Sequence, residues 1–360
     1  MKITGVRLTH VVQPFQDKSW HFALASYSEN RGILVELQTS DGVSGIGYAT
    51  AALHLGEVLE GMQAAIEQLF GPVLVGKDPF AIEALMSQID ATVLGYNRSK
   101  AAIETALYDL VGKALGVPAY QLLGGLVRES IPAVRIVPIK EPPAMAREAL
   151  KVVERGYRYL KVKVGVDPRL DVQRVAAIRQ AVGPEVGLTL DANQGWSPRA
   201  AIEVLRQVER YGIALIEQPV RSDDYAGLAQ VKAGQSIVVE ADESARSLPD
   251  IFRLAREGCV DAVSLKTPKL GGIRNVKRGA AICQAANLRC RMGMGGASRI
   301  ASAVDMHVIA STPNIDFACE VAEFDRVEFD PVEGLEVVDG VVRVPTGPGL
   351  GVRVSQAVAA

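Results

Sequence analysis

The sequence predicts an α/β protein, a modified parallel (β/α)8-type barrel preceded by a smaller α+β lobe. Its 360 residues exceed the usual size of a single hydrophobic core, which favours two lobes. Up to residue 125 the pattern is that of strands followed by helices, and after it short apolar strands alternate with amphipathic helices. We therefore expect a first lobe at 1–125 and a barrel at 126–334, with a tail at about 335–360 returning to the first lobe.

The composition is that of an ordinary soluble enzyme or binding protein. Hydrophobic residues make up 48%, charged residues 22%, and the formal net charge is -2. Nothing indicates a nucleic-acid surface or a polybasic membrane patch, and no apolar run approaches the roughly 20 residues of a membrane span. Without a leader pattern after Met1, we expect a cytoplasmic protein, and also a homo-oligomer. The four cysteines include no Cys-x-x-Cys pair, so neither a zinc site nor a disulfide framework is predicted.

The first lobe begins as an antiparallel meander and continues as helices. Residues 2–50 alternate apolar and polar positions, with turn residues at 40–42, and residues 56–123 have helical periodicity. Two irregular segments with bulky side chains interrupt this order. We expect them to close over the barrel mouth and to contact the substrate through Trp20, His21, Phe22 and His54.

Eight strands are expected in the barrel. They lie near Ile131–Val137, Arg158–Val164, Val186–Asp191, Ile213–Glu217, Ile237–Ala241, Ala262–Lys266, Leu288–Met292 and Phe317–Val321. Reacting groups of such a barrel come from the carboxyl ends of its strands.

Lys161 and Lys163 lie two residues apart in the second of these strands, so their side chains point to the same side. If that side is the barrel interior, burial and mutual repulsion favour loss of a proton near neutral pH. This makes the pair a candidate general base. The alternative is an edge strand with two solvated lysines.

The next four strands also end in ionisable residues. These are Asp191, Glu217, Asp242 and Lys266. Three oxygen ligands without a nearby His or Cys suit Mg²⁺, with Mn²⁺ as a possible substitute, and disfavour zinc. Lysines on the second and sixth strands would face each other across the mouth. Such a site can remove a proton α to a carboxylate, because the metal stabilises the enediolate and each lysine serves one face.

These motifs together resemble the enolase superfamily, in its muconate-lactonising-enzyme subgroup. The resemblance rests on Lys161-x-Lys163, Asp191-Ala-Asn193, Glu217-Gln-Pro219, Asp242-Glu-Ser244 and Lys266 followed by Gly271-Gly272. It implies a TIM-like barrel with an α+β capping domain, and Mg²⁺ held by Asp191, Glu217 and Asp242. It also implies Lys163 and Lys266 as acid/base groups, with Lys161 tuning Lys163 and Asn193 near the substrate. It selects Asp242 over Glu240 and Glu243, whereas spacing selects Lys266 over Lys269.

The sequence departs from the family pattern at two places. A Glu-Ser motif after strand seven is replaced by residues 292–298, and the Asp-x-Asp of dipeptide epimerases by Cys319-Glu320-Val321-Ala322-Glu323. Glu320 is a candidate substrate contact, with a structural role as the alternative. The leading hypothesis is a racemase or epimerase of a carboxylate such as an amino-acid derivative. The alternatives are a cycloisomerase, a succinylbenzoate-synthase-like lyase, or a non-catalytic binding protein on the same fold.

Overall fold

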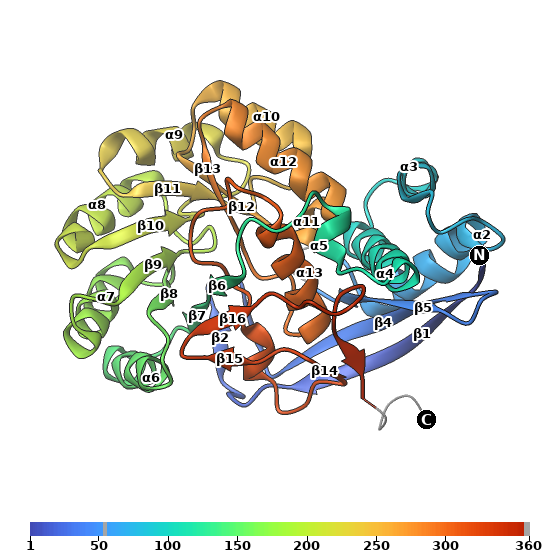
Figure 1. Ribbon diagram of the computed structural model, residues 1–360. Helices are drawn as coiled ribbons and strands as arrows, with labels where there is room; N and C mark the ends of the chain where they lie inside the picture. Colours follow the sequence, from blue (N-terminus) through green and yellow to red (C-terminus); the bar gives the residue numbers. More distant parts are fainter. Residues whose placement is uncertain (53–55, 356–360) are drawn as a thin grey trace.

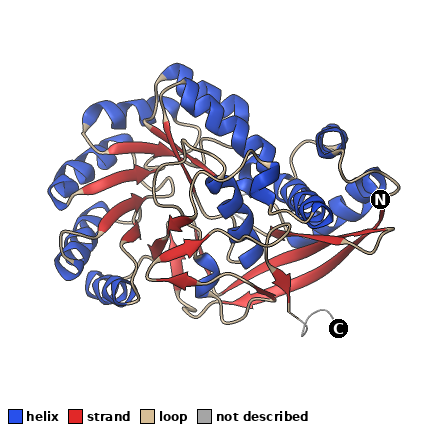
Figure 2. Cartoon of the chain, in the orientation of Figure 1, coloured by secondary structure: helices blue, strands red, loops and turns tan. Residues whose placement is uncertain are grey.

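The computed structural model describes residues 1–52 and 56–355. A parallel sheet with helices on its outside fills one half of the molecule, and an antiparallel sheet with its own helices fills the other (Figures 1 and 2). The expected barrel with a capping domain is therefore confirmed, except for its eighth strand. No helix within the described ranges is long and apolar enough to cross a membrane.

The capping lobe combines a three-stranded antiparallel sheet, in the order β1-β4-β5, with a short hairpin and a helical layer. Alternating apolar residues such as Ile33, Val35 and Leu37 pack its sheet against α4. The elements are β1 (Ile3–Pro14), β2 (Trp20–Phe22), β3 (Ala25–Tyr27), β4 (Glu29–Thr39), β5 (Ser44–Thr50), α1 (Leu59–Ala64), η2 (Ala65–Phe70), α2 (Gly71–Leu74), α3 (Ile82–Thr92), α4 (Asn97–Leu115) and α5 (Ala119–Leu122).

The barrel sheet has seven parallel strands in sequence order, from β7 to β13. Its elements are β6 (Ser130–Pro132), β7 (Val134–Val137), α6 (Pro142–Glu154), β8 (Tyr159–Lys163), α7 (Pro168–Val182), β9 (Gly187–Asp191), α8 (Pro198–Val208), η3 (Glu209–Tyr211), β10 (Ile213–Glu217), α9 (Tyr225–Gly234), β11 (Val238–Ala241), α10 (Leu248–Glu257), β12 (Ala262–Leu265), α11 (Thr267–Leu270), α12 (Ile273–Ala285), β13 (Arg289–Met292), α13 (Arg299–Ala310) and η4 (Glu323–Arg326).

The eighth predicted strand, Phe317–Val321, is not formed. Cys319 makes an isolated parallel bridge to Ala133, its carbonyl accepts from Val134 N at 2.8 Å, and Glu320 N donates to Met292 O at 3.1 Å. The segment thus touches both edges of the sheet and closes the ring. It makes too few ladder hydrogen bonds to count as a strand, so the prediction of eight regular strands was wrong by one.

The chain after η4 contains the short strands β14 (Val332–Glu333), β15 (Val337–Val338), β16 (Val341–Arg343) and β17 (Arg353–Val354). β16 pairs with β6 at the base of the barrel. Further on, Gly349 N donates to Val117 O and Leu350 N donates to the Asp109 carboxylate, both in the capping lobe. The tail therefore ties the two lobes together, at the side where Figure 1 shows it crossing from barrel to cap.

Candidate active site

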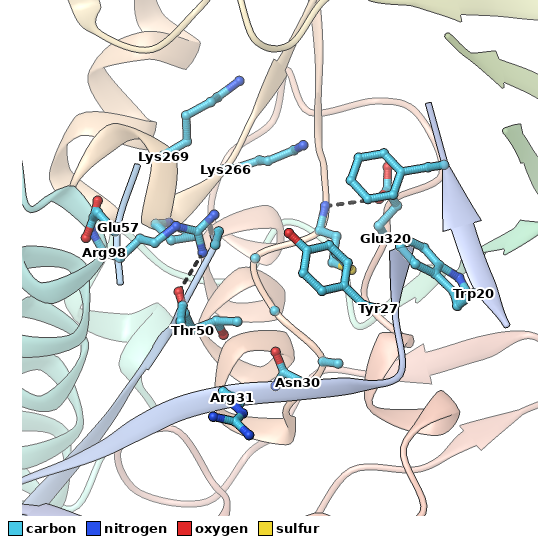
Figure 3. A pocket seen from close by; sticks show the side chains of 18 of the residues that line it. Trp20, Tyr27, Asn30, Arg31, Thr50, Glu57, Arg98, Lys266, Lys269 and Glu320 are labelled. Atoms are coloured by element: carbon cyan, nitrogen blue, oxygen red, sulfur yellow. Dashed lines mark hydrogen bonds between the residues drawn. The ribbon is translucent and has the colours of Figure 1, made fainter. Parts of the chain in front are cut away.

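A cavity of about 550 Å³ lies between the capping lobe and the carboxyl ends of the barrel strands. This volume lies in the range of pockets that hold small-molecule ligands. Barrel residues form its floor, the β2–β3 hairpin forms one wall, and β4, β5 and the start of α4 form another (Figure 3). The cavity therefore joins the two lobes at the point where the sequence predicted the chemistry.

Lys161 and Lys163 both line this cavity, and both are buried, as the alternation along β8 predicted. Lys163 Nζ donates to Asp191 Oδ2 at 2.6 Å and to Asn193 Oδ1 at 2.8 Å. Gly165 ends the strand at φ +104, and a side chain there would collide with the carbonyl of Ala192. The glycine thus lets the chain after β8 lie against the Asp191–Asn193 turn.

Loss of a proton, which burial of the lysine pair predicted, does not hold for Lys161. Burial acts to lower the pKa of Lys161, but the carboxylates of Asp191, Glu217 and Glu320 outweigh it and raise that pKa well above its usual value. Their oxygens lie 2.9, 2.8 and 2.9 Å from Lys161 Nζ. Lys161 therefore keeps its proton between these carboxylates, because charges from other strands decide its protonation state.

The three predicted metal ligands stand at the ends of adjacent strands. Asp191 ends β9, Glu217 ends β10, and Asp242 directly follows β11. All three are buried. Burial acts to raise the pKa of Asp191, but Lys161 and Lys163 outweigh it and hold that pKa below its usual range. For Glu217, burial dominates and raises the pKa.

The neighbours of Asp242 have different surroundings. Glu240 is fully buried and pairs with Arg291 Nε at 2.8 Å. Glu243 accepts from Asn193 Nδ2 at 3.1 Å, and its other oxygen is buried without a hydrogen-bond partner among the described residues. Asp242 Oδ2 instead accepts from Lys266.

Lys266 and Lys269 both line the cavity but are bound differently. Lys269 Nζ donates to Asp242 Oδ1, Asp242 O and Ser264 O, all within 2.8 Å. Among the described residues, Lys266 Nζ donates a single hydrogen bond, to Asp242, and it lies 4.0 Å from Glu217 Oε1. Burial acts to lower the pKa of Lys266, but Asp242 and Glu217 outweigh it and raise that pKa. Lys269 is anchored on all sides, whereas Lys266 retains room to act on a ligand.

Arg291 was not found by sequence reasoning. It lies on β13, is fully buried, and contacts Glu217, Glu240 and Glu320. Glu320 completes the same network, since its Oε1 accepts from Lys161 and Arg291 and its Oε2 accepts from Met294 N. Burial acts to raise the pKa of Glu320, but Lys161 and Arg291 outweigh it and lower that pKa to about 2. Glu320 also lines the cavity, so its contact with the substrate stays a prediction.

The β2–β3 hairpin directs some of the predicted cap residues into the cavity and others away from it. Trp20 and Phe22 are buried and line the cavity, and Lys163 Nζ lies 5.2 Å from the centre of the Phe22 ring. His21 alternates to the other side of the strand, where its Nδ1 hydrogen-bonds Ser26 Oγ at 2.8 Å, and it is not among the cavity residues. His54 falls outside the residues that the structure describes.

The donor set is that of a site for a hard divalent cation, although the side chains do not converge on one point. Within the described ranges, no three Asp, Glu, His or Cys side chains form a cluster that could hold a metal ion as they stand. Ammonium groups take that place, since Lys161 bridges Asp191 and Glu217 and Lys266 binds Asp242. Glu217 Oε1 is buried and has no hydrogen-bond partner in the part of the chain that the structure describes. Ammonium groups already stabilise the negative charge on these carboxylates, and Glu217 Oε1 remains available as a ligand. The residues therefore fit Mg²⁺ once the lysine ammonium groups move away from them.

Two family models cover most of the chain. One, described as enolase C-terminal domain-like, matches residues 144–358, and the other, the mandelate racemase/muconate lactonizing enzyme N-terminal domain, matches residues 3–124. The chain belongs to the mandelate racemase/muconate lactonizing enzyme family of the enolase superfamily. The resemblance stated from the sequence is thereby confirmed.

Named relatives match along nearly the whole chain. It is 31% identical to an N-succinyl-L-Arg/Lys racemase of Bacillus cereus, over 99% of this chain and 96% of that protein. It is 33% identical to muconate cycloisomerase 1 of Rhodococcus opacus, over 93% and 91%. A dipeptide epimerase structure from Enterococcus faecalis V583, complexed with Mg and the dipeptide L-Leu-L-Tyr, superposes with a TM-score of 0.93 at 32% identity, covering 98% of this chain and 99% of that one. The prediction of an isomerase of this superfamily is confirmed.

Proposed function

We propose that this enzyme racemises or epimerises an acylated amino acid by a 1,1-proton transfer between Lys163 and Lys266. The observation that carries the proposal is the placement of these two ammonium groups. They come from β8 and the end of β12, four strands apart in the sheet, and both line one cavity. One lysine can remove the proton α to a carboxylate from one face, and the other can return a proton to the opposite face.

Asp191, Glu217 and Asp242 would hold Mg²⁺, or Mn²⁺ in its place. When bound, the cation supplies charge stabilisation to the carboxylate whose α-proton is removed. Support comes from the oxygen-only donor set, the unused Glu217 Oε1, and the Mg in the related epimerase structure. The ammonium groups now bound to these carboxylates would be released toward the substrate, which places Lys266 where an acid/base group is needed.

The remaining charged residues position these groups. Arg291 contacts Glu217 and Glu320, and Glu320 contacts Lys161. These contacts would keep the ligand carboxylates in place at the strand ends. Lys161, which also lines the cavity, would bind the substrate carboxylate. Asn193 links Lys163 to Glu243 and fixes the direction of the Lys163 ammonium group.

Trp20 and Phe22 would exclude water from the reacting carbon and select the substrate. They belong to an apolar cluster with Phe15, Ile136 and Ala297. We also propose the division into a cap at 1–125 and a barrel at 126–334. Cytoplasmic location and homo-oligomeric assembly stay predictions.

Cycloisomerisation is the second candidate, favoured by the 33% identity to muconate cycloisomerase 1. It starts from the same kind of site but requires an active acid on only one face. A panel of N-acylated amino acids, dipeptides, proline derivatives and muconate-like diacids separates the two. Chiral chromatography should show inversion at the α-carbon of an acylated amino acid. Ring closure of a diacid without any inversion on the panel would replace the racemase proposal.

A further inference from the structure

Arg98 is a buried cation in the wall of the cavity, opposite the barrel floor. It is the second residue of α4, is 9% exposed, and lines the cavity. Figure 3 shows its guanidinium group, like the hydroxyl of Tyr27, pointing toward the middle of the cavity. The capping lobe thus presents a positive charge to whatever binds between the lobes.

The charge of Arg98 is only partly compensated by nearby side chains. Its Nη1 donates to the main-chain oxygen of Thr50 at 3.0 Å, and no carboxylate among the described residues forms an ion pair with it. Glu57 lies nearby, but its Oε1 accepts from the main-chain N of Arg98 at 3.3 Å. Burial lowers the pKa of Arg98, only partly offset by Glu57, Tyr27 and Asp242. A buried charge in this state is costly, and an anionic ligand would offset the cost.

A second polar group on the same wall lacks a partner. Thr50 lines the cavity, and its Oγ1 is buried without a hydrogen-bond partner among the described residues. The Arg98 guanidinium group, with several N–H donors in a fixed fork, suits a carboxylate. Thr50 also packs against Gly296, where a side chain would collide with its hydroxyl.

The other cavity arginines lack these features. Arg31 is exposed and paired with Glu29 at 2.6 Å, Arg246 is exposed and donates through Nε to Glu243 O at 3.0 Å, and Arg326 is buried but paired with Glu323 at 3.2 Å. Glu320, the candidate substrate contact of the sequence analysis, already binds Lys161, Arg291 and Met294 N. Both oxygens of Glu320 are therefore engaged within the protein, whereas the guanidinium group of Arg98 faces the cavity.

We propose that the substrate carries a second carboxylate, away from its reacting carbon, and that Arg98 binds it. This rests on the proposed racemase function and names its substrate class, an acylated amino acid with two carboxylates. The second carboxylate comes either from a dicarboxylic acyl arm or from an acidic side chain. Both sources present the same chemistry to Arg98.

Two matched substrate pairs test the proposal and separate the sources. N-succinyl and N-butyryl derivatives of one amino acid differ only in the carboxylate of the acyl arm. N-acetylglutamate and N-acetylnorvaline differ only in that of the side chain. For one pair, Arg98→Gln should lower kcat/KM for the diacid by roughly 10²-fold, as expected for a lost buried charge pair, and leave its neutral partner nearly unchanged. The affected pair identifies the source.

Arg31→Gln is the control, because it removes a cation from the same cavity that is exposed and already paired. It should alter neither ratio. Arg98→Lys, which keeps the charge, should recover part of the preference and shows that any loss is not a folding defect. An equal effect of Arg98→Gln on diacids and neutral analogues would overturn the proposal, as would a wild-type preference for the neutral or amine-bearing compounds.

Calorimetry makes the result independent of turnover. In the presence of Mg²⁺, the wild-type protein should bind one diacid at least tenfold more tightly than its neutral partner, and Arg98→Gln should abolish the difference. If no compound is racemised but this preference is found, the racemase function fails while the role of Arg98 stands. If racemisation occurs and affinity does not depend on Arg98, the racemase function stands and the proposed role of Arg98 fails.

Discussion

Replacing Lys161 by Met tests whether a buried ammonium group holds the ligand carboxylates in place. Lys161 is 1% exposed and contacts Asp191, Glu217 and Glu320. Met fills a similar volume without charge. The substitution therefore removes the cation with little change in packing and leaves three buried carboxylates with too few cations.

The magnitude follows from the contact distances. With an effective dielectric constant of about 20, each of the three contacts at 2.8–2.9 Å corresponds to about 6 kcal/mol of gross attraction, most of which offsets desolvation. Removing one partner of a buried ion pair costs about 3–5 kcal/mol net. We expect Lys161→Met to lose at least this much stability in the presence of a chelator. A cation that binds only the folded state stabilises it, so saturating Mg²⁺ should stabilise both proteins. The variant should gain more stability than the parent protein, because its buried carboxylates lack the charge of Lys161.

Urea unfolding followed by circular dichroism and by tryptophan fluorescence, with chelator and with Mg²⁺, measures both effects. Lys232→Met is the matched control, since Lys232 pairs with Asp261 at the surface, where such pairs contribute about 0–1 kcal/mol. A Lys161→Met protein as stable as the control without metal would refute the reasoning. Equal stabilisation of parent and variant by Mg²⁺ would refute the expected larger effect of Mg²⁺ on the variant.

Three further outcomes are expected. Burial lowers the pKa of His307 to about 4, so between pH 6.5 and pH 4 only the unfolded chain binds a proton at this residue. The free energy of unfolding should therefore fall by about 3 kcal/mol over that range. His307→Gln should flatten this part of the pH profile of stability measured by urea unfolding. Glu217→Gln should weaken Mg²⁺ binding sharply, and unchanged affinity in calorimetry would remove Glu217 from the metal site. Trp20→Ala should change relative rates across the substrate panel, and unchanged ratios would contradict its place in the lid.

The sequence revealed those features of the fold and site that depend on local pattern. Alternation along β8 predicted that Lys161 and Lys163 share one face, and the structure places both in one cavity. Strand boundaries were close enough to locate Asp191, Glu217 and Lys266 at strand ends. Parallel strands place their carboxyl ends at one edge, so no long-range information was needed for this arrangement.

Features that depend on contacts between distant segments were missed. The eighth strand looks apolar and extended, but whether it forms a ladder depends on its fit between Ala133 and Met292. The protonation state of Lys161 depends on Glu320, which is 159 residues away. Arg291 reads as a surface residue beside Arg289, and only its inward position on β13 could have indicated a buried role. Arg98 carries no signal in the sequence, because a charge at the start of a helix is usually solvated.

Deuterium incorporation by single-lysine variants tests the central claim most directly. Each enantiomer of a turned-over substrate is incubated in D₂O with Lys163→Ala or Lys266→Ala, with Lys232→Ala as the control. We expect each lysine variant to lose α-proton exchange with a different enantiomer, by roughly 10²–10⁴-fold or more, while the control exchanges both. Loss of exchange with the same enantiomer in both variants, or full exchange in either, would contradict a proton transfer between Lys163 and Lys266.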